Sequence, residues 1–302
     1  MSPERHRRRF FHLAALVAFG VAAFVLVSGP ALARKGAETG YDDAFGGVEG
    51  AAPALRVAGS SVFPLLTEVT FDTGESSPTR ATVEGIGTLL FGRYVLTVAH
   101  AITLDHLETT VPTARGRIIV PLDGRPVARS TWLLDGDRRV PLRLVASRED
   151  VDIALLLAPE TIDLPGFPYP VGDSEALELA DRVALLESDP VAGVLFRPGA
   201  VAALRGSAVV HSVSRNDQVF LMSLGLTSGE SGAPVVAPRR GHYELVGLAQ
   251  GTYVGPRQLA WAIRIGPALE ALKRADSWSP DLQRFLHLCG HDGVASLGSG
   301  AP

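Results

Sequence analysis

The sequence predicts an all-β fold on the basis of three observations. Short apolar runs rich in β-branched residues recur along the middle of the chain with turn residues between them, which is typical of strands. Two dipeptides, Asp123-Gly124 and Arg240-Gly241, are flanked by strand-like residues and predict hairpin turns. The chain contains 32 glycines and 21 prolines among 302 residues, a share below that of disordered sequences. We therefore expect a globular chain built from many short strands.

The expected strands follow one another in chain order. They cover residues 86–91, 94–97, 118–122, 142–145, 153–157, 183–186, 219–222, 235–237, 245–248 and 261–265. One helix is predicted directly after the last strand, over 267–274, because Pro267 suits a first helical turn and basic residues occupy the last turn. A second amphipathic stretch, 282–288, lies within a C-terminal tail over 276–302.

The first 33 residues predict an export signal. Four arginines precede an apolar run over 10–27, and Ala31-Leu32-Ala33 forms a small-x-small cleavage pattern. The apolar run is about as long as the shortest membrane spans, so two alternatives stay open. Cleavage after Ala33 gives a secreted or periplasmic protein, and retention gives a membrane tether. Residues 34–56, rich in glycine, alanine and acidic residues, are interpreted as a linker or pro-segment.

Composition and charge exclude several classes of function. The formal charge is -4 and the only concentrated basic run lies at the N-terminus, so the chain lacks the footprint of a nucleic-acid-binding protein. Cys289 is the single cysteine, which excludes an intrachain disulfide, and no Cys/His cluster has zinc-ligand spacing. We expect no metal and no cofactor. An exported chain without disulfides indicates a bacterial rather than an animal protein.

Three segments contain residues suited to chemistry. Residues 95–100 form a strand that ends in His100, Asp152 begins an apolar strand, and Ser231 lies between two glycines. Taken singly, each also has a structural interpretation, as a strand-end histidine, an edge carboxylate and a serine in a tight turn. Their joint occurrence is what favours catalysis, because a serine hydroxyl needs a neighbouring base and imidazole supplies one near neutral pH.

Together the three segments resemble the chymotrypsin-like serine peptidase family. The family's motifs are Thr-Ala-Ala-His, Asp-Ile-Ala-Leu and Gly-Asp-Ser-Gly-Gly-Pro, and this chain has Thr-Val-Ala-His ending at His100 and Asp-Ile-Ala-Leu beginning at Asp152. The third motif reads Gly-Glu-Ser-Gly-Ala-Pro around Ser231. The order His, Asp, Ser is also that of the family. The resemblance implies a serine endopeptidase that acts on proteins or peptides.

The resemblance covers residues 57–275 and implies a fold for them. We expect two packed six-stranded antiparallel Greek-key barrels with a short C-terminal helix. The first barrel is expected over about 57–165 and the second over about 166–275. The first would carry His100 and Asp152, and the second would carry the serine.

The resemblance also implies a role for each site residue. Ser231 is the expected nucleophile, His100 the base, and Asp152 the carboxylate that orients the imidazole. The backbone N–H groups of Gly229 and Ser231 are the expected oxyanion hole. Asp150, two residues before Asp152, lacks the apolar run behind it and is interpreted as a solvated turn residue.

The primary substrate pocket is expected at three small residues. The resemblance places its base at Gly225 and its walls at Gly251 and Ala260. No carboxylate lies at the base, and an unpaired buried cation is costly. We therefore expect cleavage after Leu, Phe, Tyr or Ala rather than after Lys or Arg, with the glycines leaving depth for the side chain.

Two departures from the family pattern surround the serine. Glu230 replaces the usual Asp and Ala233 replaces the usual second Gly. In relatives activated by cleavage, the acidic residue pairs with a newly formed α-amino group. Arg56-Val57 resembles such a cleavage site, so activation by cleavage and activity without it both stay open.

Two other functions compete with the peptidase. A catalytically silent relative would use the double barrel to bind a partner protein, and such relatives usually lose the triad that is complete here. A lipase or esterase would have Gly-x-Ser-x-Gly between a parallel strand and a helix. Ala233 stands where that motif needs its second glycine.

Overall fold

The structure is a computed structural model that describes most of the chain after residue 54. The described residues are 55–104, 107–113, 116–189, 192–206, 216–239, 242–253, 259–275 and 279–290. The signal or anchor expected over 1–33 lies outside them, as does nearly all of the linker expected over 34–56. Among these described residues, no helix is long and apolar enough to span a membrane.

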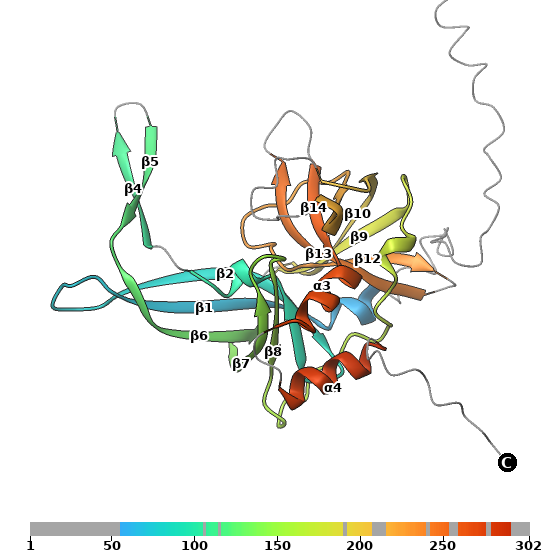
Figure 1. Ribbon diagram of the computed structural model, residues 1–302, viewed down its shortest axis with the longest axis horizontal. Helices are drawn as coiled ribbons and strands as arrows, with labels where there is room; N and C mark the ends of the chain where they lie inside the picture. Colours follow the sequence, from blue (N-terminus) through green and yellow to red (C-terminus); the bar gives the residue numbers. More distant parts are fainter. Residues whose placement is uncertain are drawn as a thin grey trace, which may run out of the picture. The chain divides into compact units, whose positions relative to one another are not determined.

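Barrel one is closed by six strands from the first half of the described chain (Figure 1). They are β1 (Val62–Asp72), β2 (Thr79–Leu90), β3 (Tyr94–Thr97), β6 (Arg125–Asp135), β7 (Arg138–Arg148) and β8 (Ile153–Leu157). Their order around the barrel is β1-β2-β3-β8-β7-β6, and every neighbouring pair is antiparallel.

Barrel two is closed by the six strands that follow. They are β9 (Arg182–Asp189), β10 (Gly193–Ala203), β11 (Val219–Met222), β12 (Pro234–Arg239), β13 (His242–Tyr253) and β14 (Leu259–Arg264). Their order, β10-β11-β14-β13-β12-β9, repeats that of barrel one, with the third strand beside the sixth. The expected pair of six-stranded antiparallel barrels is therefore confirmed.

A separate hairpin interrupts barrel one in sequence. β4 (Leu107–Thr113) pairs only with β5 (Gly116–Leu122) among the described strands, and Figure 1 shows the two as a ribbon apart from both barrels. The hairpin predicted at Asp123-Gly124 is therefore wrong, because β5 before it and β6 after it pair with other strands. Around Arg240-Gly241 the prediction holds, since β12 and β13 pair directly there.

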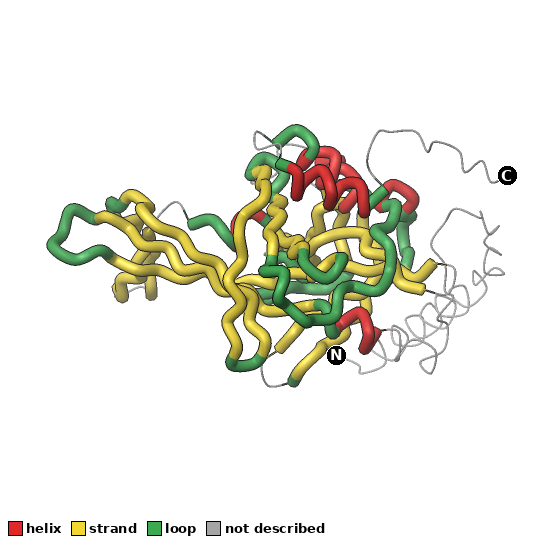
Figure 2. The backbone as a smooth tube through the Cα atoms, turned by 90° about the horizontal axis from the view of Figure 1, so that it is seen from below, coloured by secondary structure: helices red, strands yellow, loops and turns green. Residues whose placement is uncertain are grey.

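Four strands were not expected from the sequence, namely β4 of the separate hairpin and β1, β6 and β10 of the barrels. In β6 and β10, exposed residues interrupt any apolar run. Residues 125–130 of β6 are all exposed, and β10 alternates partly buried and exposed residues around Pro198 and Gly199. Strands make up most of the described backbone in Figure 2. Backbone pairing, which the side-chain pattern does not record, holds β1, β6 and β10 in the barrels.

Two helices follow the last strand. α3 (Ile265–Leu272) begins two residues before the helix predicted at Pro267, which fits because the first turn of a helix leaves its N–H groups unbonded. α4 (Pro280–Leu288) lies within the stretch interpreted as a tail. Phe285 of α4 is fully buried and packs against Tyr94 of barrel one, with ring centroids 5.3 Å apart. One continuous cluster of buried side chains contains residues of both barrels and both helices.

Candidate active site

The strand order brings His100 and Asp152 together. His100 lies on a short 3-10 turn just after β3, and Asp152 lies just before β8. β3 and β8 are antiparallel neighbours, with Thr97 opposite Ala154, so the end of one strand lies beside the start of the other. Asp152 Oδ2 is 2.7 Å from His100 Nδ1, and Asp152 Oδ1 accepts a 2.8 Å hydrogen bond from the His100 backbone N–H.

The contacts of Asp152 fix the imidazole in one tautomer. The carboxylate is 3% exposed and has a positive φ of 61°, a conformation in which a non-glycine residue is uncommon. Because the carboxylate accepts, His100 Nδ1 carries the proton in this contact and Nε2 presents a lone pair. The His100 side chain is 46% exposed, so its ring is accessible to a neighbouring hydroxyl group or to a ligand.

Gln250, in β13, connects the aspartate to the serine. Its Nε2 donates a 2.8 Å hydrogen bond to Asp152 Oδ2. Its backbone carbonyl accepts the Ser231 hydroxyl at 3.4 Å, a long and weak bond. Gln250 is 5% exposed. Sequence reasoning missed this residue because no motif surrounds it, and only the pairing of β13 within barrel two brings it to the site.

The serine lies in a loop with two glycines in left-handed conformations. Gly229 has φ 92° and Gly232 has φ 91°, which side-chain-bearing residues rarely adopt. Among the backbone hydrogen bonds of the described residues, neither the Gly229 N–H nor the Ser231 N–H has an acceptor. Two N–H groups on either side of Glu230 are therefore available to a ligand, as the resemblance implies for an oxyanion hole.

The serine loop is bonded to both barrels. The Ser231 carbonyl accepts the N–H of Ile86 in β2 at 2.8 Å, and the Gly232 N–H donates to Ala249 in β13 at 2.8 Å. A side chain at Gly232 would collide with the Ile86 carbonyl and the Thr97 hydroxyl. The structure thus brings Ser231 to the same junction between barrels as His100 and Asp152. Among the hydrogen bonds of the described residues, the Ser231 hydroxyl donates to the Gln250 carbonyl and not to His100.

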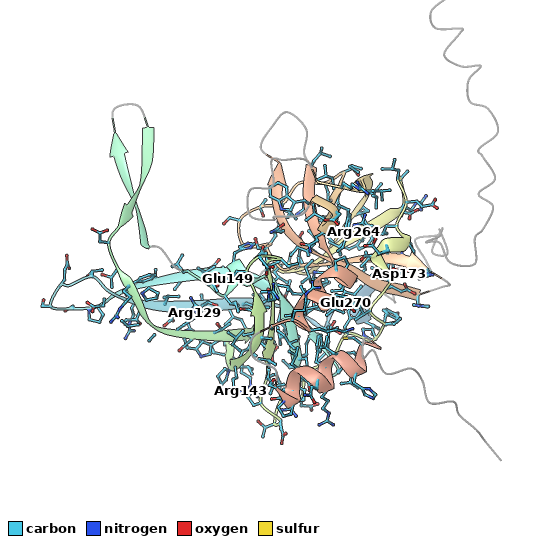
Figure 3. All side chains as sticks on the ribbon, viewed as in Figure 1. Arg129, Arg143, Glu149, Asp173, Arg264 and Glu270 are labelled. Atoms are coloured by element: carbon cyan, nitrogen blue, oxygen red, sulfur yellow. The ribbon has the colours of Figure 1, made fainter. Side chains whose placement is uncertain are left out.

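A pocket of about 360 Å³ opens beside the imidazole. It is lined by residues of both barrels, namely Ala99, His100, Thr103, Glu149, Asp152, Gln250 and Trp261. Glu149, labelled in Figure 3, lies in the turn between β7 and β8. Trp261 supplies the large apolar surface of this pocket, and the sequence signalled it only as part of a strand.

The three residues expected to form the primary pocket are not among those that line this one. The Gly225 carbonyl accepts a hydrogen bond from Arg197, and Ala260 is fully buried. At Gly251 a Cβ would lie 2.7 Å from the Trp261 ring, so Trp261 occupies the space beside this glycine. Residues 254–258, which connect β13 to β14, lie outside the described residues. The pocket at Gly225, Gly251 and Ala260 therefore stays a prediction.

Asp150 and Cys289 are not among the residues that line this pocket. Asp150 is half exposed and forms two hydrogen bonds with Arg148, and these bonds hold the pKa of its carboxyl below the usual range. It is a surface turn residue, as expected. Cys289 follows α4, and the described part of the chain contains no group of three His, Cys, Asp or Glu side chains able to hold a metal ion.

Comparison with solved structures shows the same fold in a group of proteases. The HtrA-type protease AlgW with a tripeptide matches with a TM-score of 0.52 and 18% identity, over 74% of this chain and 62% of that chain. A serine-to-alanine variant of AlgW with a decapeptide matches with a TM-score of 0.52 and 17% identity, over 74% of this chain and 65% of that one. The chain therefore corresponds to less than two thirds of those proteins.

Comparison with protein families and curated proteins gives one match. None of the curated proteins matches the chain. The family described as Trypsin-like peptidase domain matches residues 85–248, more than half of the chain. The matched range contains β3, the turn before β8 and the serine loop, the three places from which the site is built. The chain belongs to the trypsin-like peptidase domain family.

Proposed function

We propose that the chain is a serine endopeptidase in which Ser231 is the nucleophile, His100 the general base and Asp152 the orienting carboxylate. One observation carries the proposal. The buried Asp152 carboxylate holds His100 by both its ring Nδ1 and its backbone N–H. A surface histidine gains nothing from such an arrangement, whereas a base must have one tautomer and one orientation.

The first half of the reaction forms an acyl-enzyme. Ser231 Oγ attacks the carbonyl carbon of the scissile peptide bond while its proton passes to His100 Nε2. Asp152 then stabilises the imidazolium and remains ionised itself. The oxyanion that forms accepts hydrogen bonds from the Gly229 and Ser231 N–H groups, a contribution of about 3 kcal/mol for each donor. The imidazolium returns its proton to the leaving amine as the C–N bond breaks.

The second half releases the acid. Water attacks the acyl ester with His100 again accepting the proton, and the imidazolium then protonates Ser231 Oγ as the ester bond breaks. A pocket of about 360 Å³ adjoins His100, the residue that accepts the proton of the attacking water. No step of this cycle needs a metal or a cofactor.

The proposed substrates are peptides with an apolar or small residue before the scissile bond. Two matched protease structures contain a tripeptide and a decapeptide, which supports a peptide substrate here. A basic residue is disfavoured because Arg197 binds the Gly225 carbonyl, and its positive charge would repel a Lys or Arg side chain there. Comparing kcat/KM for peptides that differ only at this residue measures the preference, and faster cleavage after Lys or Arg would contradict it.

Labelling with a fluorophosphonate tests the nucleophile without knowledge of the substrate. We expect the native chain to react at one residue, and Ser231→Ala to abolish both labelling and peptidase activity while leaving the unfolding temperature unchanged. Ser223→Ala is a matched control, because Ser223 lies in the same segment and bonds only to β10. Labelling that persists in Ser231→Ala would remove the assignment. A folded chain that never reacts would favour a silent, partner-binding relative.

A further inference from the structure

Arg197 of β10 lies between two carboxylates that belong to different segments. Its Nη1 donates to Glu187 of β9 at 2.8 Å and to Glu230 of the serine loop at 2.8 Å. Its Nη2 donates to the backbone carbonyl of Gly225 at the start of the same loop. The two carboxylate side chains are 7% and 13% exposed and that of Arg197 is 32% exposed. One guanidinium thus binds the side chain near the end of the loop and the backbone at its beginning.

Glu230 passes this attachment on to the loop backbone. Its two carboxylate oxygens accept from both the N–H and the hydroxyl of Thr227, and its own N–H donates to the Thr227 carbonyl at 3.3 Å. These contacts close a tight turn over 227–230 that contains Gly229. Glu230 is also the residue between the two N–H groups that have no backbone acceptor. Its side chain therefore sets the direction in which these groups point.

We propose that Arg197 is a positioning residue that holds the oxyanion loop in its working conformation, an inference that rests on the proposed peptidase function. The planar guanidinium fixes Glu230 and Gly225 relative to each other, so the N–H groups of Gly229 and Ser231 stay aimed at one point. The hydrogen bonds of Arg197 go to Glu187, Glu230 and Gly225. Arg197 acts through Glu230.

The same contacts replace the amine that cleavage would create. Residues 55–59 form a helical turn in which the Arg56 carbonyl accepts the Ser60 N–H and Ala58 is fully buried. Val57 is 51% exposed, and the Glu230 carboxylate accepts hydrogen bonds from Arg197 and Thr227. The internal cation is already in place in the uncleaved chain. We therefore expect the chain to be active without cleavage at Arg56-Val57.

The decisive experiment compares Arg197→Met with Arg197→Lys. Methionine keeps the apolar stem and removes the charge, while lysine restores a cation that binds one carboxylate but lacks the fork. We expect Arg197→Met to lower kcat and the rate of fluorophosphonate labelling by about 10-fold to 100-fold, with a smaller change in KM, and Arg197→Lys to recover part of the loss. Arg143→Met, which removes a surface ion pair with Asp281, is the matched control and should label like the native chain.

Hydrogen exchange gives a readout that does not depend on activity. Peptides covering 225–233 should exchange faster in Arg197→Met than in the native chain, and at the native rate in Arg143→Met. A double variant tests the route through Glu230, since Arg197→Met should cost much less in a Glu230→Gln background than alone. Native labelling, kcat and exchange in Arg197→Met would overturn the proposal, as would an undiminished loss in the Glu230→Gln background.

The two proposals fail in different ways. A native chain that never labels, combined with faster loop exchange in Arg197→Met, removes the peptidase and keeps Arg197 as the residue that orders the loop. A native chain that labels at the same rate as Arg197→Met keeps the peptidase and removes the role of Arg197. If Arg197→Met does not fold, Arg197→Lys and Glu230→Gln carry the same comparison, and native labelling in both variants would overturn the proposal.

Discussion

The connection between the third and fourth strands carries one of the proposed catalytic residues in each barrel, and the two connections are held in different ways. In barrel one it begins with the short turn of His100, which is held by Asp152 from the start of the sixth strand. In barrel two it is the loop of Ser231, which is held by Arg197 from the second strand. In the proposed mechanism, the Asp152 carboxylate that anchors the turn in barrel one also takes part in the reaction. In barrel two, Arg197 anchors the loop but takes no part in the reaction.

This difference teaches that similar topology does not impose similar support. Replacing a carboxylate that both orients and stabilises a base abolishes most of the catalysis. Weakening an ion pair that supports a loop is expected to reduce activity only in part. Variants in barrel one should therefore act mainly on activity at nearly constant stability. Variants of the residues that hold the serine loop in place should change activity and stability together.

The largest expected effect in this comparison is that of Asp152→Asn. The amide keeps the size of the side chain but lets His100 Nδ1 accept a hydrogen bond, which puts the proton on the wrong nitrogen. We expect kcat to fall by about 10⁴-fold with little change in the unfolding temperature. Asp150→Asn, two residues away on the surface, is the control and should retain native kcat. A kcat within tenfold of native in Asp152→Asn would contradict the role of this carboxylate.

Gly232→Ala should show the coupled behaviour of the serine loop. The new Cβ collides with the Ile86 carbonyl and the Thr97 hydroxyl at a positive φ, so we expect a loss of about 2 to 4 kcal/mol in the free energy of unfolding and reduced activity. Gly136→Ala isolates the conformational part, since Gly136 also has a positive φ but open space around it. Denaturant titration measures both. Equal losses in the two variants would show that the collision is relieved.

Gln250→Leu tests the residue that joins the two sides of the site. Leucine fills similar space and removes the hydrogen bond to the Asp152 carboxylate, which is worth about 1.5 to 3 kcal/mol. We expect kcat to fall by about 10-fold to 100-fold, with KM less affected, because the Asp152 contact to His100 remains. Steady-state kinetics over pH 5 to 9 measures the change. An unchanged kcat would mean that Gln250 only fills space.

Glu187→Gln has the smallest expected effect, and its sign depends on pH. Burial, followed by the nearby charge of Glu230, raises the pKa of Glu187 even though Arg197 opposes the shift. A raised pKa in the folded state means that the contribution of this carboxyl to stability is full below its unfolded pKa and is lost as the pH rises through the folded value. Glutamine should therefore raise the unfolding temperature at neutral pH. The gain should vanish on acidification below the ordinary glutamate range.

The exposed ion pair of Glu160 supplies the control for that measurement. Glu160 is 80% exposed and pairs with Arg93 on the surface, where such pairs contribute little. Glu160→Gln should leave the unfolding temperature nearly unchanged across the same pH range. A Glu187→Gln variant that is less stable than the native chain at neutral pH would reverse the sign assigned to the buried carboxyl.

Much of the fold could be predicted from the sequence because its core strands coincide with apolar runs. The apolar runs at 94–97, 153–157 and 219–222 coincide with β3, β8 and β11 or overlap them fully. The sequence pattern did not reveal β1, β4, β6 and β10, and in β6 and β10 exposed residues interrupt any apolar run. The hairpin expected at Asp123-Gly124 failed for another reason, since a turn dipeptide says nothing about which strands pair across it.

The candidate site divides along the same line. His100, Asp152 and Ser231 lie in local motifs, and local motifs can be read from a sequence. The contacts of Gln250, Arg197 and Trp261 join residues far apart in sequence. Gln250 and Asp152, for example, are separated by 98 positions. No local pattern encodes such a pair. These contacts depend on barrel closure and on the junction between barrels, which only the three-dimensional structure shows.

The bond between the Ile86 N–H and the Ser231 carbonyl has a consequence for biosynthesis. Translation runs from barrel one to barrel two, and domains made first generally fold first. A ribosome-bound chain that has completed β8 already holds its imidazole and carboxylate yet has no nucleophile. The serine loop finds its final backbone partner only when β13 and barrel one are both present. Under the proposed mechanism, a nascent chain therefore cannot cleave neighbouring chains on the polysome until its last strands have been synthesised.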